Sequence, residues 1–176
     1  MVEQPEWIGR RNFDLNSEAI LRDAYRLLTT VLSDSVIAEE AADADDPLSH
    51  LRGQFVEDEL VHTVVGLAVV NRLHAEHMHG PRSDPSEPSF PPMEHECGTL
   101  RPDLQSDHEQ PLRFREACNK IIHALSIEAE TVPLEGHAFP VLPRTLNLYG
   151  ERSGVDWEAT LDVVEYIRAT FRNFRE

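Results

Sequence analysis

The chain has 176 residues, of which 32 are acidic and 16 are basic, and its formal net charge is −16. A chain of this length can bury the core of a single domain without disulfides, and a surface this acidic repels nucleic-acid backbones unless it carries a local basic patch. Only two cysteines (Cys97 and Cys118), N-terminal residues without an apolar signal region, and no membrane-spanning apolar run predict a cytoplasmic protein.

The acidic residues are concentrated in two stretches. Residues 34–59 contain nine acids against Arg52, and residues 84–109 contain seven acids against Arg101. The segment that follows is locally basic, with Arg113, Arg115 and Lys120 against Glu116. A phosphate-binding segment on an acidic protein is therefore conceivable there, while the acidic stretches favour a basic partner.

Two long helices are predicted in the first half of the chain. The first begins near Asn16 or Ser17, which are good N-cap residues, and fades in the alanine-rich and acidic run 38–46. The second begins at about Pro47 or Phe55 and runs to Met78, before a glycine and a proline. Its middle is apolar nearly all round, which predicts a central position in a bundle.

Residues 80–111 hold seven of the twelve prolines and no periodic pattern, so we expect a long acidic loop there. A third helix is predicted from Pro111 to about Leu125. Alternation within 126–131 and 144–149 predicts two short strands that form a hairpin. A last helix is expected to begin at Asp156 as its N-cap, with an apolar stripe from Trp157 to Phe174.

These elements predict a mainly α fold. We expect one domain over residues 1–176, built as a bundle of about four helices, with a small β-hairpin inserted before the last helix and a proline-rich acidic loop at 80–111.

The third helix carries the strongest candidate for chemistry. Arg115, Asn119 and His123 fall at i, i+4 and i+8, so they share one strip of the helix surface. The histidine could move a proton while the arginine stabilises a charged phosphate oxygen. An ordinary solvated helix face has the same pattern, so both interpretations stay open.

The segment from Asn119 to Ala124 resembles the late-helix motif of HEPN domains, small helical bundles of bacterial toxin–antitoxin and defence systems, many of them ribonucleases. The resemblance implies that His123 is the catalytic histidine and that Asn119 is the polar residue after the motif arginine. In this match the arginine position is Cys118, and Arg115, one turn earlier, would replace it. If it does not, the resemblance implies a degenerate domain without RNA-cleaving activity. The family usually forms homodimers, for which the apolar last helix is a candidate interface.

Two other hypotheses come from composition and spacing. An acidic interaction protein could bind a basic partner or mimic nucleic acid. Alternatively, His74 and His77 at i, i+3 could share a zinc ion with His95 or Cys97 from the proline-rich loop.

Overall fold

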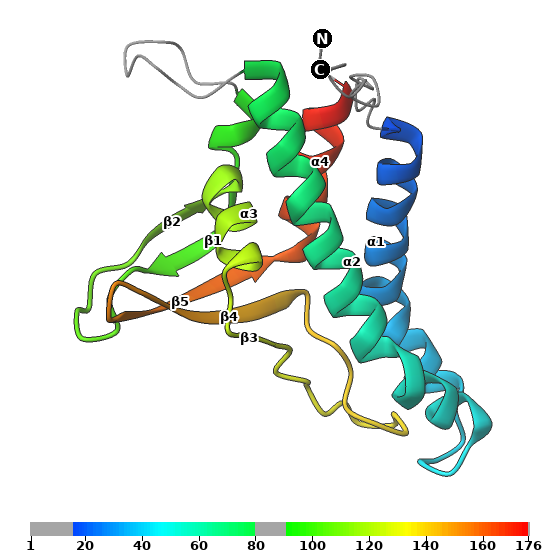
Figure 1. Ribbon diagram of the computed structural model, residues 1–176. Coiled ribbons are helices and arrows are strands. Elements are labelled where there is room, and N and C mark those ends of the chain that lie inside the picture. Colours follow the sequence, from blue (N-terminus) through cyan, green and yellow to red (C-terminus); the bar gives the residue numbers. More distant parts are fainter. Residues whose placement is uncertain (1–15, 80–90, 176) are drawn as a thin grey trace, which may run out of the picture.

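In the part of the chain that the structure describes, the fold combines four α-helices with a five-stranded antiparallel sheet. The computed structural model describes residues 16–79 and 91–175. Figure 1 shows that α1, α2 and α4 lie side by side, and that the sheet extends to one side of them. The expected helical bundle with a small hairpin is therefore wrong, because five strands form a complete layer of the fold.

The first two described helices form a long hairpin. Helix α1 (Ser17–Glu40) begins at the predicted cap, where the Asn16 side chain accepts a hydrogen bond from the backbone N–H of Ala19. Helix α2 (Pro47–His79) has close to the predicted bounds, and it runs antiparallel to α1. None of the described helices is long and apolar enough to cross a membrane.

The hairpin is pinned near its tip by a buried carboxylate. Asp34 is 1% exposed and accepts two hydrogen bonds from the Arg52 guanidinium, at 2.9 and 3.2 Å. The same carboxylate accepts a hydrogen bond from the backbone N–H of Leu142, so the loop before β4 is held against the helices. Arg52 also lies over the Phe139 ring, at 4.7 Å from its centroid.

The sheet has the strand order β2-β1-β5-β4-β3. Its strands are β1 (Glu96–Arg101), β2 (Gln110–Arg113), β3 (Ser126–Glu128), β4 (Thr145–Arg152) and β5 (Val155–Asp162). Gly98 in β1 has φ +139°, and a Cβ placed there would meet the Thr160 carbonyl oxygen at 1.9 Å. Only glycine permits β1 to approach β5 this closely.

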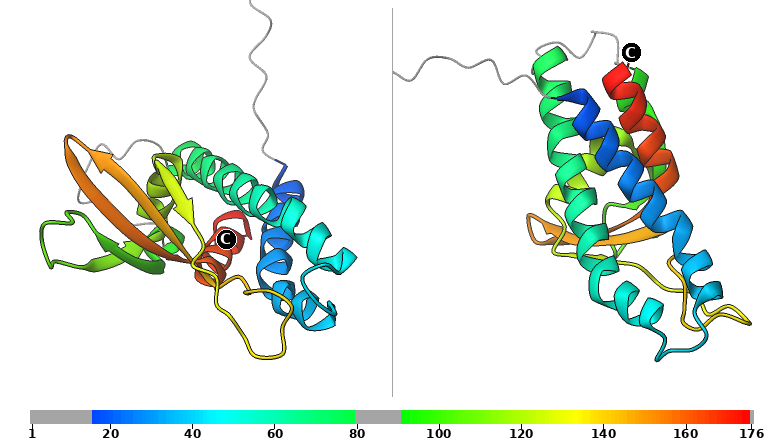
Figure 2. Two further views of the ribbon diagram at one scale, coloured as in Figure 1. Left: turned by 90° about the horizontal axis from the view of Figure 1, so that it is seen from below. Right: turned by 90° about the vertical axis from the view of Figure 1, so that its right-hand side faces the viewer.

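Two helices pack between the sheet and the hairpin. Helix α3 (Phe114–Ile122) contacts α2 on one side and β1, β2 and β4 on the other, as Figure 2 shows from below. Helix α4 (Val163–Arg175) follows β5 directly, with the Asp162 carboxylate capping the N–H groups of Val164 and Glu165. A single core joins helices and sheet, and its largest buried side chains include Tyr166, Phe114, Leu67, Leu148 and Leu161.

The predicted loop at 80–111 is wrong in part, since residues 102–109 contain neither helix nor strand but the residues on both sides of them do. A short 3₁₀ helix (Pro91–Glu94) and strands β1 and β2 lie within it, while its residues 80–90 fall outside the described part. Pro111 does not start a helix; it is in β2 and faces Thr99 of β1. Proline is tolerated in β2 because this strand lies at the edge of the sheet.

The expected start of the last helix is also wrong. Residues 155–162 form β5, in which Trp157, Ala159 and Leu161 are buried while the residues between them are less so. This alternation has the period of a strand, and the helical period begins only at Val163. The predicted strands at 126–131 and 144–149 do pair, as β3 and β4, but they form one edge of the larger sheet.

Candidate functional site

A polar pocket of about 580 Å³ lies where α2, α3 and the β4–β5 hairpin meet. We call it the α3 pocket. Three cations, two carboxylates, one amide, one imidazole, one hydroxyl and one indole line it. These residues are Arg72, Glu116, Asn119, Lys120, His123, Glu151, Arg152, Ser153 and Trp157.

The hairpin turn brings β4 and β5 to the pocket. Arg152 and Val155 face each other across a two-residue turn, in which Ser153 has φ 56° and Gly154 has φ 81°. Two positive φ values are typical of a type I′ turn, which matches the twist of the paired strands. The turn thereby positions Arg152 and Ser153, which both line the pocket.

The floor of the pocket depends on a glycine. Gly150 faces Trp157 across the two strands, and a Cβ at Gly150 would meet the indole ring at 2.3 Å and the His123 carbonyl oxygen at 3.1 Å. The bare backbone therefore lets the ring lie flat between β4 and α3. Trp157 is only 2% exposed, so it supports the pocket and leaves little surface for a ligand.

Lys120 is the only lysine of the chain, and it is 7% exposed. Its Nζ lies 4.0 Å from the centroid of the Trp157 ring and 3.7 Å from a carboxylate oxygen of Glu116. Burial lowers the pKa of Lys120 below its ordinary value, Glu116 opposes this effect, and the positive charge of Arg152 adds to it. An anion in the pocket would stabilise the protonated amine.

Both carboxylates of the pocket have partners within the protein, whereas several of its hydrogen-bond donors do not. Glu116 pairs with Lys120, and Glu151 accepts the backbone N–H of Gly154. Within the described residues, the side chains of Asn119, His123 and Arg152 form no hydrogen bond or ion pair with another residue. The groups of the pocket that are free within the described residues thus include a cation, an amide and an imidazole.

Arg72 supplies the third cation, from α2. Its guanidinium pairs with Glu76 at 2.9 Å, and the two side chains are 42% and 49% exposed. Exposed i, i+4 pairs of this kind contribute little to stability, so a ligand can recruit the arginine at small cost.

The pocket contains two of the three residues expected on the strip. Asn119 and His123 line it, but the exposed Arg115 is not among the lining residues. The pocket faces the side of α3 that carries Glu116, Asn119 and Lys120, and at 100° per residue Arg115 lies about 90° from the centre of that side. His123 is the C-cap of α3, because the helix ends at Ile122.

Sequence reasoning missed Arg72, Arg152 and the role of Lys120. Arg72 and Arg152 are 80 positions apart, and only the fold brings them to one pocket. One signal was present: Lys120 is the sole lysine, beside the amide and imidazole of the predicted strip.

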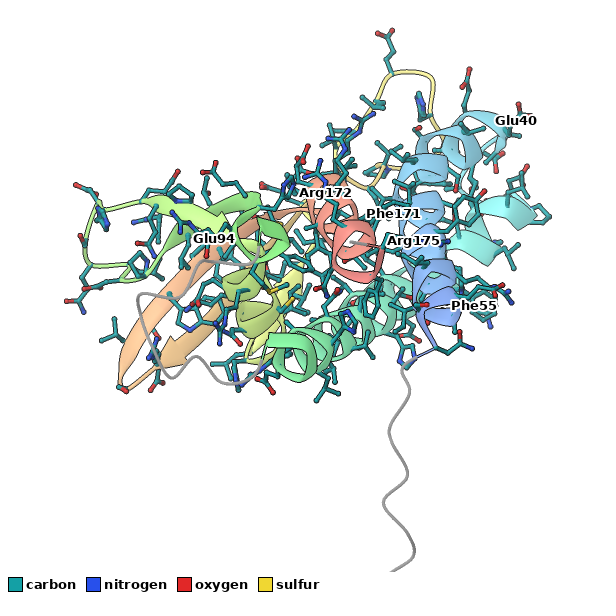
Figure 3. The ribbon with its side chains drawn as sticks, turned by 90° about the horizontal axis from the view of Figure 1, so that it is seen from above. Glu40, Phe55, Glu94, Phe171, Arg172 and Arg175 are labelled. Carbon is teal, nitrogen blue, oxygen red and sulfur yellow. The ribbon has the colours of Figure 1, made fainter. Side chains whose placement is uncertain are left out.

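Two of the proposed zinc ligands, His95 and His74, contact other side chains. His95 is held between Glu165, at 2.9 Å, and Arg172, at 3.0 Å (Figure 3 labels Arg172 on α4). The His74 ring stacks on Phe174, with centroids 4.3 Å apart. Cys97 is fully buried, and burial raises the pKa of its thiol.

No group of three or more His, Cys, Asp or Glu suited to a metal occurs within residues 16–79 and 91–175. The side chain of His77 lies outside the described set. The zinc site therefore stays a prediction without support from these contacts.

No family model matches the chain, and neither a curated protein nor a solved structure matches it.

Proposed function

We propose that the α3 pocket binds the phosphate groups of a ligand, with single-stranded RNA as the leading class. The observation that carries the proposal is the convergence of Arg72, Lys120 and Arg152, from three separate elements, in a chain of net charge −16. Arginine and lysine bind phosphate oxygens through charge-assisted hydrogen bonds.

The charge arrangement inside the pocket supports an anionic ligand. Three cations face two carboxylates, and both carboxylates have partners within the protein. The free guanidinium of Arg152 can donate to a phosphate oxygen, and the Asn119 amide can donate beside it. The acidic surface elsewhere repels nucleic acid, so RNA would bind locally and not along the whole molecule.

RNA cleavage is the second candidate, and it is favoured by the position of His123 in the same pocket. As a general base, its imidazole would take the proton of a ribose 2′-hydroxyl. The 2′-oxygen then attacks the adjacent phosphorus, the cations stabilise the added negative charge, and the 5′-oxygen leaves with a proton from water. The products would be a 2′,3′-cyclic phosphate and a 5′-hydroxyl.

The HEPN resemblance also predicts His123 as the catalytic residue, but it gives no information on the arrangement of the pocket. HEPN domains are helical bundles, whereas the described part of this chain contains a five-stranded sheet beside its helices. Cys118 stands at the position of the motif arginine, so another residue would have to supply the guanidinium. The lining of the α3 pocket includes Arg152 and not Arg115.

Binding is tested by titrating the purified protein with a fluorescent single-stranded RNA oligonucleotide at low salt. Arg152→Ala should weaken binding about tenfold, because a charge-assisted hydrogen bond is lost. Arg115→Ala is the matched control, since this exposed arginine of α3 lies outside the pocket lining. Equal effects of the two substitutions, or no measurable binding, would refute the proposal.

Cleavage is tested separately with the same oligonucleotide. His123→Ala should abolish the appearance of 2′,3′-cyclic phosphate ends and leave RNA binding within about threefold of the parent, because the proposal assigns phosphate binding to the arginines and lysine of the pocket and proton transfer to His123. Binding without any cleavage by the parent protein would eliminate the second candidate and leave the first intact.

A further inference from the structure

The outer side of the α1–α2 hairpin presents an apolar patch near the tip. We call it the outer face, and it consists of Val36 on α1 with Leu48, Leu51 and Phe55 on α2. The exposed fractions of these residues are 54%, 40%, 57% and 54%, respectively. On α2 the three residues recur at i, i+3 and i+7, so they share one side of the helix.

Ion pairs between the two helices set their register. Asp34 pairs with Arg52, and Arg26 pairs with Glu59, so the helices run antiparallel with these positions opposite each other. Val36 is therefore level with the turn of α2 that carries Leu48 and Leu51. In Figure 3, Phe55 and Glu40 lie at the side of the molecule away from β1 and β2.

Acidic side chains border this patch at both ends. Glu40, Asp43 and Asp45 are exposed at the tip of the hairpin, and Asp58 is exposed one turn beyond Phe55. The one arginine within residues 34–59, Arg52, is committed to the buried carboxylate of Asp34. The outer face thus combines exposed apolar side chains with a border of unneutralised negative charge.

We infer that the outer face docks a basic, amphipathic helical segment of another protein. The apolar stripe of such a segment would cover Leu51 and Phe55, and its lysines or arginines would face the acidic border. Leu48 to Phe55 spans about 10 Å of helix, which matches two turns of a partner helix. A second copy of this chain is a poor occupant, because it would bring the same negative border against itself.

This inference is independent of the α3 pocket. The pocket is cationic and lies between α2, α3 and the β4–β5 hairpin, whereas the outer face belongs to the tip of the α1–α2 hairpin. RNA and a basic peptide should therefore bind without competing.

The test uses a fluorescent 14-residue peptide of leucine and lysine, with the leucines on one helical face. Its anisotropy should report saturable binding to the full chain, and the combined change Leu51→Ser and Phe55→Ser should weaken binding at least about tenfold. Leu125→Ser is the matched control, because this side chain is 80% exposed and lies after α3. A peptide with glutamate in place of lysine should not bind.

Charge reversal provides an independent variant. Asp58→Lys should weaken binding of the lysine peptide and remove part of its salt dependence, while circular dichroism shows an unchanged fold. The inference is overturned if the serine variant binds like the parent, if Leu125→Ser weakens binding equally, or if the glutamate peptide binds as well. It is also overturned if sedimentation shows that the parent protein is a homodimer and the serine variant is a monomer.

Discussion

The α3 pocket and the outer face differ in charge and in how the chain builds them. The pocket draws its cations from positions 72, 120 and 152, which only the complete fold brings together. The outer face comes from residues 36–55, within one helical hairpin. Ligands of opposite charge could therefore bind to one strongly acidic chain, because a few converging cations outweigh a diffuse negative charge at short range. Changes in one region should leave the other intact, and the following predictions test that separation.

The largest effect is expected beneath the outer face, at Asp34. Asp34→Ala leaves the Arg52 guanidinium and the Leu142 N–H without their partner. Removal of one member of a buried pair costs about 3 kcal/mol or more, which for a chain of this size lowers Tm by about 6–12 °C. Calorimetry measures this shift, and Asp45→Ala, an exposed carboxylate of the same tip, should leave Tm unchanged.

The lysine peptide should also lose affinity for Asp34→Ala, because α1 and α2 are no longer pinned at the tip. RNA binding, measured well below Tm, should persist. Loss of both activities at that temperature would show that the two regions are not separable.

The same glycine-to-alanine change should alter stability with opposite signs beneath the α3 pocket and in α2. Gly150→Ala places a methyl group against the Trp157 ring and should destabilise the protein by about 1–3 kcal/mol, with loss of RNA affinity. Gly66→Ala in α2 meets no atom within 4 Å and should stabilise it by about 0.5–1 kcal/mol. Urea denaturation of both variants measures the contrast, which fails if the two changes have the same sign.

A third prediction concerns the pH dependence of RNA binding. The pKa of Lys120 is lowered from its ordinary value of 10.5, mainly by burial, so its charge is lost earlier than that of an exposed lysine as the pH rises. Because phosphate binds the protonated amine, the affinity should fall as the pH rises through that lowered pKa, by up to about tenfold for one lost charge-assisted contact.

Lys120→Arg is the control for this pH effect, since arginine stays protonated and also stacks on aromatic rings. Its affinity should stay constant over the same alkaline range. A parallel fall in both proteins would assign the pH dependence to another group.

The smallest effect on stability is expected at Arg72. Its pair with Glu76 is exposed, so Arg72→Ala should change the free energy of unfolding by less than about 0.5 kcal/mol. RNA affinity should nevertheless fall severalfold, while peptide binding stays unchanged. Equal RNA affinity of the variant and the parent would remove Arg72 from the site.

Local patterns predicted the helices of the hairpin well. The Asn16 cap, the apolar spacing and the stop near residue 80 are all short-range signals, and α1 and α2 follow them. The strands were harder to predict, because β1 and β2 and the segment between them contain prolines and acids that favour loops. In addition, the pairing of β1 with β5 joins positions about 60 residues apart. In β5, the apolar residues from Trp157 onward merge with those of α4, which hid the change of period.

The candidate site was predicted only in part, for a related reason. Asn119 and His123 share one helix, and their spacing identified them. Helical spacing alone favoured Arg115 over Lys120, since the direction in which α3 faces its neighbours depends on tertiary packing. Arg72 and Arg152 had no local signal that could connect them to α3.

The central claim is that phosphate-bearing ligands bind the α3 pocket and not the outer face. The most direct measurement is backbone-amide NMR during titration with a single-stranded RNA oligonucleotide. The account predicts shifts at Asn119, His123, Arg152 and Ser153, with Leu48, Leu51 and Phe55 unchanged. Shifts centred on the hairpin tip, or no shifts at the four pocket residues at saturating RNA, would contradict it.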